Sequence, residues 1–422
     1  MYLITSQIIE RANFGQSGGQ ELPKLHPMIL TQCAVCATDL GLTLGKKCGR
    51  CSTRYCGPEC QKQHWERGGH DKLCKKIKKA GGAEQYNANK KYTEAVAVAA
   101  EACAEDTKGQ TCYICTQALH WKSKEGLVRG CSCRGTAGFA HVSCLAEQAK
   151  ILVAEAEENH LGIKAEEERF ERWSSCSLCE QDYHGVVQCA LGWACWKTYV
   201  GRPETDGARY TAISILGNGL GMAGQHQDAL FVQEAELSTL RRLGAPEENI
   251  LVVQSNLAGT YQELGRLEEA NRMLRDVYSG RLNVSSQEHE VTLKAALNYA
   301  NSLVRLNRFE EAKALIRKMM PAARRVPGES HDVGLTMRWL YAVALYEDPA
   351  ATLEGLREAV TTLEDVVPIA RRVLGGTHPL VEGMEISLRA ARAARAALAA
   401  REGDDVSSVC EGVAAMTPPG GA

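Results

Sequence analysis

The stretch from Cys131 to Cys144 constrains this chain most, because it places a Cys-x-Cys pair seven residues ahead of a His-x-x-Cys pair. One Cys-x-x-Cys pair precedes this stretch and another follows it. Four ligand pairs in one segment are what two tetrahedral zinc ions require. We therefore predict a zinc module whose eight ligands are Cys112, Cys115, Cys131, Cys133, His141, Cys144, Cys176 and Cys179.

A second set of seven cysteines and one histidine lies upstream and also suffices for two tetrahedral ions. Its members are Cys33, Cys36, Cys48, Cys51, Cys56, Cys60, His70 and Cys74. Sites with four protein ligands have no open position, so all four zinc ions are expected to be structural and not catalytic. A module this small buries little core, and zinc binding should supply most of its folding free energy, on the order of 10 kcal/mol per site.

Eighteen cysteines could also form disulfides, but Met1–Glu10 lacks the basic start and apolar run of a secretory signal. Paired thiols outside an oxidising compartment indicate metal sites. The most apolar stretch, residues 186–200, is too short to span a bilayer. With 49 basic against 51 acidic residues, no overall field favours nucleic acid. We expect a soluble protein of the cytoplasm, with the nucleus as the alternative, that uses neither membrane nor nucleic acid as partner.

The upstream set resembles a MYND finger over about residues 33–74, including Tyr55-Cys56, Cys60-Gln61 and Trp65 ahead of the histidine. The resemblance favours His70 over His64, because His70 has the family's three-residue gap to the last cysteine. It implies interleaved sites, with Cys33, Cys36, Cys56 and Cys60 in one and Cys48, Cys51, His70 and Cys74 in the other. It also implies docking of short proline-containing peptides, with a purely fold-stabilising role as the alternative.

The downstream set resembles a RING-CH finger and not a PHD finger, because one residue separates Cys131 from Cys133 and seven separate Cys133 from His141. Gly135, Phe139 and Leu145 fit the same pattern. The resemblance implies one site of Cys112, Cys115, His141 and Cys144 and another of Cys131, Cys133, Cys176 and Cys179.

Ubiquitin ligation is the activity that the RING-CH resemblance implies. Such a module binds a charged ubiquitin-conjugating enzyme and accelerates transfer by proximity and orientation, so no catalytic residue of its own is expected. Ile114, the apolar residue before the second cysteine, is the expected contact, and Trp173 is a weaker candidate. Local packing is the alternative role for both side chains.

Two features depart from the RING-CH pattern. Glu180 follows the last ligand, where active ligases often carry a lysine or arginine. The 31 residues between Cys144 and Cys176 are also unusually many, and their acidic, helical pattern covers Ala154–Arg172 with a break at Gly162. Familiar RING-CH ligases have membrane spans after the zinc module, and we expect none here.

The second half of the chain repeats at intervals of 41, 42 and 42 residues, marked by Leu216, Leu257, Tyr299 and Tyr341. A helical period of this kind is typical of a stacked solenoid. The segments 256–261 and 374–379 resemble the longer tetratricopeptide repeats of kinesin light chains. The resemblance implies four helix pairs and a closing helix, with a groove suited to extended peptides or partner helices.

The expected fold is mainly α, with two small cross-braced double-zinc modules followed by a tetratricopeptide-like solenoid. A helical linker should fix the two zinc modules relative to each other. The predicted regions are a flexible N-terminus (1–30), the MYND-type finger (31–76), the linker (77–108), the RING-CH-type finger (109–185), a connecting helix (186–204), the repeats (205–400) and a disordered tail (401–422).

Two functions fit these modules. The first is a soluble ubiquitin-protein ligase that recruits a conjugating enzyme through the RING-CH module and substrates through the MYND finger and repeats. The second is a non-catalytic zinc-binding adaptor. Ile114 and the complete ligand sets favour the ligase, whereas Glu180 and the long insert favour the adaptor. In both cases the expected partners are proteins or peptides and not small-molecule substrates.

Overall fold

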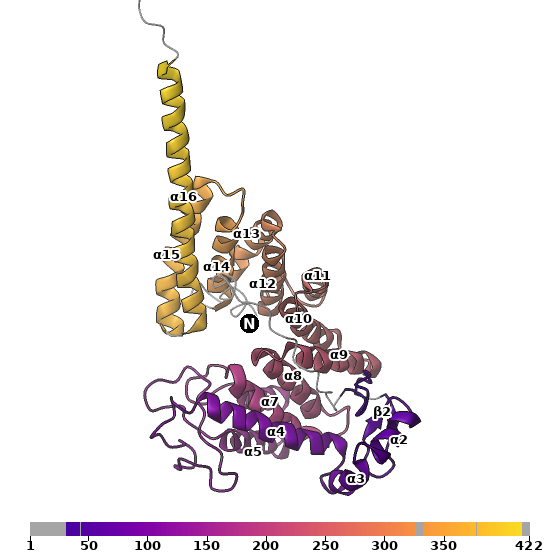
Figure 1. The fold of residues 1–422 in the computed structure, drawn as a ribbon. Coiled ribbons are helices and arrows are strands. Elements are labelled where there is room, and N and C mark those ends of the chain that lie inside the picture. The colour runs from indigo at the N-terminus through magenta and orange to yellow at the C-terminus, as the bar shows by residue number, and fades with distance from the viewer. Residues whose placement is uncertain (1–30, 43, 326–331, 377, 416–422) are drawn as a thin grey trace, which may run out of the picture. The chain divides into compact units, whose positions relative to one another are not determined.

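The computed structural model describes residues 31–42, 44–325, 332–376 and 378–415, and the predicted flexible N-terminus lies outside these ranges. The described residues are mainly helical, which confirms the expected fold class (Figure 1). They fall into two compact units that meet in sequence between Gly265 and Arg266. Both zinc modules belong to the first unit.

The first zinc module consists of a short hairpin and two helices. Strands β1 (Lys46–Lys47) and β2 (Arg54–Tyr55) pair antiparallel, with Lys46 opposite Tyr55. Helices α2 (Pro58–Glu66) and α3 (His70–Lys79) follow. Helix α3 buries His70, Cys74 and Ile77, which lie four and three residues apart and therefore share one face.

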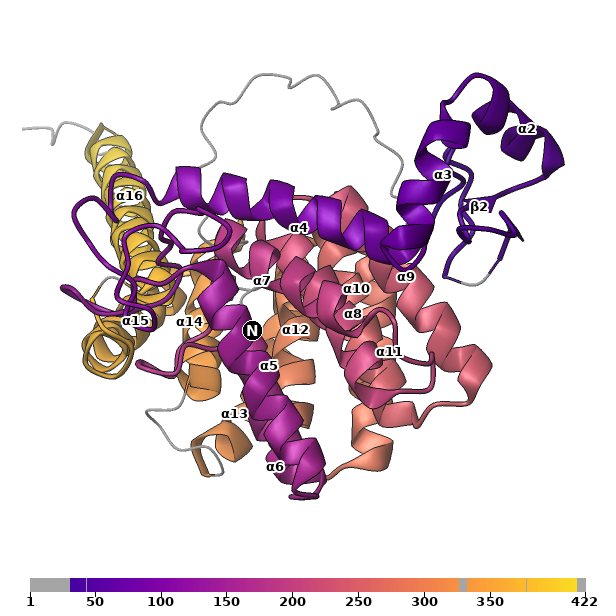
Figure 2. The same ribbon diagram turned by 90° about the horizontal axis from the view of Figure 1, so that it is seen from below.

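Helix α4 (Ala83–Ala102) forms the main part of the predicted linker and runs from the first zinc module to the second (Figure 2). It packs along α7 (Gly185–Tyr199). The Gln85 side-chain amide donates to the Lys197 carbonyl at 2.9 Å, and the hydroxyls of Tyr92 and Ser143 lie 2.8 Å apart. The linker is thus packed against its neighbours along its length.

The second zinc module is mostly loop, with isolated bridges at Val128–Ala140 and Ser175–Asp182. Its helices are α5 (Val142–Glu158), α6 (Ile163–Phe170) and the short η1 (Glu171–Trp173). The insert helix was predicted to start at Ala154, twelve residues after the observed start of α5 at Val142. The reason is a buried stripe of Val142, Leu145, Ala149 and Val153, which extends the helix back to the zinc ligands.

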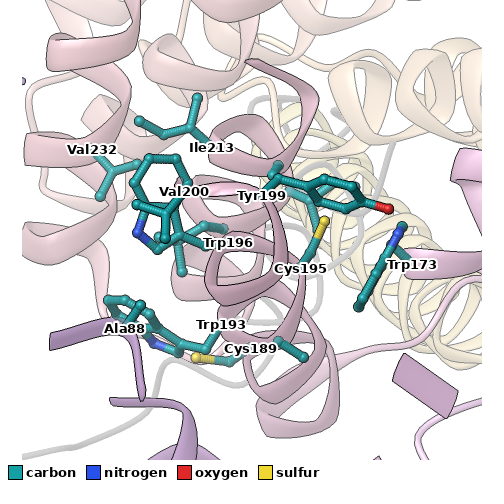
Figure 3. Close-up of a cluster of buried hydrophobic side chains, with 14 of the residues drawn as sticks. Ala88, Trp173, Cys189, Trp193, Cys195, Trp196, Tyr199, Val200, Ile213 and Val232 are labelled. Carbon is teal, nitrogen blue, oxygen red and sulfur yellow. The ribbon is translucent and has the colours of Figure 1, made fainter. Parts of the chain in front are cut away.

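Helix α7 is buried on nearly all sides and forms the centre of the first unit (Figure 3). Trp196 and Cys195 lie in a cluster that also takes side chains from α4, α5, α8 (Gly207–Met222) and α9 (His226–Leu243). Helices α7 and α8 approach closely at two glycines. A Cβ atom on Gly219 would lie 2.8 Å from the Gln188 carbonyl oxygen, and one on Gly192 would lie 3.1 Å from that of Ile215.

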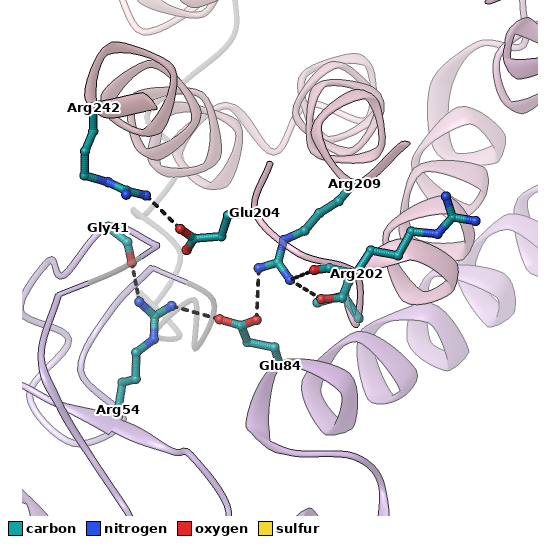
Figure 4. Close-up of polar contacts among 8 residues, drawn as sticks. Gly41, Arg54, Glu84, Arg202, Glu204, Arg209 and Arg242 are labelled. Atoms are coloured by element: carbon teal, nitrogen blue, oxygen red, sulfur yellow. Dashed lines mark hydrogen bonds and ion pairs between the residues drawn. The ribbon is translucent and has the colours of Figure 1, made fainter. Parts of the chain in front are cut away.

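A charged bridge ties the hairpin of the first zinc module to this core (Figure 4). The buried Arg54 donates to the Gly41 carbonyl at 3.0 Å and lies 3.5 Å from one oxygen of Glu84 on α4. The other Glu84 oxygen lies 3.4 Å from Arg209, which also donates to the Arg202 carbonyl. Glu84 therefore joins two arginines from elements that are far apart in sequence.

Helix α10 (Glu247–Glu263) packs on α9 and completes the described helices of the first unit. The second unit contains α11 (Leu267–Val284), α12 (Glu290–Arg305), α13 (Phe309–Arg325), α14 (Asp332–Tyr346), α15 (Leu353–Leu374) and α16 (Pro379–Ala415). Consecutive helices from α11 to α16 pack on one another. In the first unit α8 packs on α9, and in the second unit α12 pairs with α13 and α14 with α15, while α16 packs on α15 as the closing helix.

The end of the chain differs from the expectation of a disordered tail. Helix α16 continues past residue 400 to Ala415, because the alanine-rich segment that follows Leu388 favours helix. The last seven residues lie outside the described part. Among the described residues, no helix is both long enough and apolar enough to cross a bilayer.

Candidate metal centres

The structure brings together the same four groups of ligands that the spacing and the family resemblances predict. In each group the four ligand atoms lie within 4.8 Å of one another. The groups are Cys33, Cys36, Cys56 and Cys60; Cys48, Cys51, His70 and Cys74; Cys112, Cys115, His141 and Cys144; and Cys131, Cys133, Cys176 and Cys179. Each can hold one zinc ion, and each module holds two sites.

The four Cys-x-x-Cys pairs share one turn. In each, the residue after the second cysteine adopts a left-handed backbone, and its N–H donates to the carbonyl of the first cysteine. These residues are Ala37, Ser52, Thr116 and Glu180, with φ of 57°, 61°, 61° and 55°. The turn directs both thiols to the same side, and this left-handed conformation disfavours ordinary residues by about 1 kcal/mol.

Distances between sulfur atoms fit a tetrahedral zinc site and not a disulfide. The Sγ atoms of Cys48 and Cys74 lie 3.9 Å apart, and those of Cys133 and Cys176 lie 3.8 Å apart. Zinc–sulfur bonds of about 2.3 Å in a tetrahedron place the sulfurs about 3.8 Å apart. A disulfide would require about 2.05 Å.

The two histidines present different nitrogens to their sites. His70 places Nε2 3.4 Å from the Cys51 sulfur, whereas His141 places Nδ1 3.3 Å from that of Cys115. The Nε2 atom of His141 lies 3.4 Å from the Ala118 carbonyl oxygen, which can accept its proton and orient the ring. Burial lowers the pKa of His141, so the imidazole is neutral and able to bind metal.

The competing histidine lies outside the site. The Nδ1 atom of His64 is 3.0 Å from the hydroxyl of Tyr55, and His64 belongs to none of the four groups. Its ring lies against that of His70, with 4.8 Å between the ring centroids. His64 therefore packs beside His70, which was predicted to be the ligand from its three-residue gap to Cys74.

Without a metal ion, Cys131 and Cys176 share a proton within their ligand group. A hydrogen bond from Cys131 lowers the pKa of Cys176 to about 4, and the same bond together with burial raises the pKa of Cys131. The four thiols of this ligand group therefore do not all ionise readily in the absence of a cation. A divalent ion removes this conflict by neutralising the thiolates.

Gly138 is a functional position that the sequence analysis missed. It has a φ of 82°, and a Cβ atom there would lie 2.6 Å from Cβ of Cys133 and 3.2 Å from Sγ of Cys131. Only glycine therefore lets this loop close over the second pair of cysteines. The sequence signal that could have identified Gly138 was its position between the Cys-x-Cys and His-x-x-Cys pairs. At the nearby Gly135, by contrast, no atom lies within 4 Å of an added Cβ.

The two expected partner contacts have opposite environments. Ile114 is 37% exposed on the first Cys-x-x-Cys turn of the module. Trp173 is fully buried in the core around α7, which fits the alternative role of local packing. Leu178, inside the last Cys-x-x-Cys turn, is 50% exposed and was not predicted.

Comparisons with known proteins agree with this geometry. A MYND finger model matches residues 33–74, a RING-variant domain model matches residues 112–179, and a tetratricopeptide repeat model matches residues 250–290. Among curated proteins, no sequence matches this chain.

Two solved structures are similar in fold to part of this chain. BtubC (BKLC) from P. vanneervenii is 15% identical, with a TM-score of 0.39 over 67% of this chain and 95% of its own. The kinesin light chain nearly identical TPR-like repeats of Podosopora anserina are 20% identical, with a TM-score of 0.35 over 55% of this chain and 97% of their own. From its family matches, this chain joins a MYND finger and a RING-variant domain to tetratricopeptide-type helical repeats.

Proposed function

We propose that this protein is a ubiquitin-protein ligase whose RING-variant domain recruits a charged ubiquitin-conjugating enzyme. The observation that supports this proposal is a RING-variant domain with both ligand groups complete and apolar residues exposed on two of its turns. Ile114 and Leu178 occupy equivalent places in the first and last Cys-x-x-Cys turns of the domain. Exposed apolar side chains on a rigid turn are suited to a protein contact.

The domain needs no nucleophile for this function. Its contribution is to hold the conjugating enzyme and its ubiquitin thioester in a reactive geometry near the target lysine. The zinc ions fix the two exposed turns, so loss of either ion would displace the contact surface. The MYND finger and the helical repeats supply the docking of substrates, and linking docking sites in one chain raises the effective concentration of the target.

The test is an autoubiquitination assay over a panel of conjugating enzymes. Wild-type protein should form chains with at least one enzyme, and Cys131→Ser and His141→Ala variants should form none. Ile114→Ala should lower the rate about tenfold or more, a loss typical of removing an interface anchor worth 1–2 kcal/mol. Val252→Ala, which truncates an exposed apolar side chain on α10, is the matched control and should leave the rate unchanged.

A second candidate is a non-catalytic adaptor, and Glu180 favours it. This exposed carboxylate stands immediately after the last ligand, where active ligases often carry a cation. Glu180→Arg separates the two candidates. A weakly active ligase should become faster, whereas an adaptor should stay inactive with every conjugating enzyme while retaining its zinc.

A further inference from the structure

A pocket of about 290 Å³ lies among α7, α8, α9 and the start of α10, beside the loop that carries Leu42. Its walls are mainly apolar and include Trp196, Tyr210, Ile213 and Leu240. None of the sixteen candidate zinc ligands lines it. The pocket is therefore separate from the metal centres and from the exposed turns of the RING-variant domain.

Glu236 contributes a buried carboxyl group to this pocket. The residue is 2% exposed, and the Ser214 hydroxyl donates a hydrogen bond to it. Burial raises the pKa of Glu236 to about 8, and no basic side chain offsets this effect. A buried carboxylate without a cationic partner is unfavourable, so the group stays mostly protonated near neutral pH.

The other charged side chains of the pocket already have partners (Figure 4). Arg209 pairs with Glu84 at 3.4 Å, and Glu204 pairs with Arg242 at 2.8 Å. Tyr210, the remaining titratable side chain in the lining, has a pKa raised to about 12 by burial and is neutral. Glu236 is thus the acidic side chain of this pocket that pairs with no cation among the residues that the structure describes.

Aromatic rings next to a carboxylate are suited to an ammonium group. Trp196 and Tyr210 both line the pocket, and aromatic faces attract cations. The Trp196 ring already has the Arg209 guanidinium 5.4 Å from its centroid. A volume of about 290 Å³ is near the lower limit for small-molecule sites, which favours a single extended side chain over a cofactor.

We propose that this pocket binds a lysine side chain of a partner protein, with Glu236 as the counter-ion of its ammonium group. The four-carbon stem would lie along the apolar walls, and one compact charge would meet one carboxylate. An arginine side chain fits less well, because its five N–H donors would find few acceptors in an apolar lining. This inference does not depend on ligase activity, since it concerns a separate site.

Lysine binding should release a proton. Below the pKa of about 8 the Glu236 carboxyl is mostly protonated, and it must ionise to pair with the incoming ammonium group. Affinity should therefore rise as the pH increases from 6 to 8 and level off above the pKa. A neutral ligand that accepts a hydrogen bond from the protonated carboxyl would show the opposite dependence.

The experiment is isothermal titration calorimetry of the full chain with Nα-acetyl-lysine methylamide, in two buffers that differ in ionisation enthalpy. We expect saturable binding with release of about one proton at pH 7. The norleucine analogue, which lacks the charge, should bind at least about tenfold more weakly. This comparison uses wild-type protein alone, so it does not depend on the folding of a variant.

Glu236→Gln keeps the shape of the side chain and should weaken lysine binding about tenfold or more and abolish proton release. Glu247→Gln, an exposed carboxylate in the first turn of α10 that does not line the pocket, is the control and should change the affinity by less than about twofold. The proposal is rejected if the lysine compound does not bind. It is equally rejected if norleucine or arginine analogues bind as well as lysine, or if Glu236→Gln binds like wild type. Autoubiquitination is not among these readouts, so the two proposals can fail independently.

Discussion

The two zinc modules carry the same number of ligands but differ in what surrounds them. The core of the MYND finger consists largely of its own ligands, together with Leu40, Tyr55, Ile77 and Ala83. The RING-variant domain shares a core with two long helices, because Val96 of α4 and Leu191 of α7 pack among its buried side chains. We therefore expect the two modules to differ in how far their folding depends on zinc, although each has eight candidate ligands.

Removing zinc should have the largest effect, and the two modules should respond to it differently. Chelation removes on the order of 10 kcal/mol of binding free energy per site, so the finger should unfold while α4, α5 and α7 keep much of their protection. Hydrogen exchange followed by mass spectrometry checks this for each segment. If α4 and α7 lose protection as completely as α3, the shared core does not hold the second module.

Gly138→Ala should disrupt the RING-variant domain and leave the finger intact. The added Cβ meets the Cys133 side chain at 2.6 Å and strains a left-handed backbone, which together should cost about 2–4 kcal/mol. Zinc content should fall below four per chain, and exchange should rise in residues 112–144. Gly135→Ala is the matched control, because it has the same kind of backbone and open space around it. Equal effects of the two changes would contradict the steric explanation.

Gly219→Ala tests whether the contact between α7 and α8 supports the second module. The Cβ would lie 2.8 Å from the Gln188 carbonyl oxygen, so the helices must separate at a cost of about 1–3 kcal/mol. We expect a lower melting temperature for the first unit and faster exchange in α7. Gly221→Ala on the same helix has open space and should be neutral or slightly stabilising. A destabilised Gly221→Ala variant would indicate a helix-wide effect.

Glu84→Gln should have the smallest effect and should loosen the attachment of the MYND finger to the helical core of the first unit. It weakens the pairing of the buried Arg54 and the partly buried Arg209 with Glu84 and leaves two cations without their shared carboxylate, at a cost of about 1 kcal/mol. Faster hydrogen exchange in the β1–β2 hairpin and in residues 200–209 would show this loss of pairing. Glu94→Gln, which removes an exposed pairing with Lys90 on the same helix, should change nothing measurable. If Glu84→Gln leaves hydrogen exchange unchanged, helix packing alone positions the MYND finger.

Ligand spacing predicted the local turn at each Cys-x-x-Cys pair, which does not depend on distant residues. The grouping of distant pairs into four sites was what the family resemblances implied, and the structure brings the same groups together. The 42-residue period likewise determined the helix pairs. Features that rest on contacts between distant segments were not predictable. The spacing left Trp173 open between a partner contact and local packing, and the fold buries it. The start of α5 was missed because its apolar face is covered by other elements, among them α7.

The sequence by itself therefore determined the candidate zinc ligands and the order of the modules, since both are recorded in short-range patterns. Tertiary structure alone decided the rest. It showed Gly138 to be sterically required, brought Glu84 between two arginines and enclosed Glu236 in an apolar pocket. The physical reason is that burial and charge pairing depend on which distant segments meet, and no local pattern in the sequence records that.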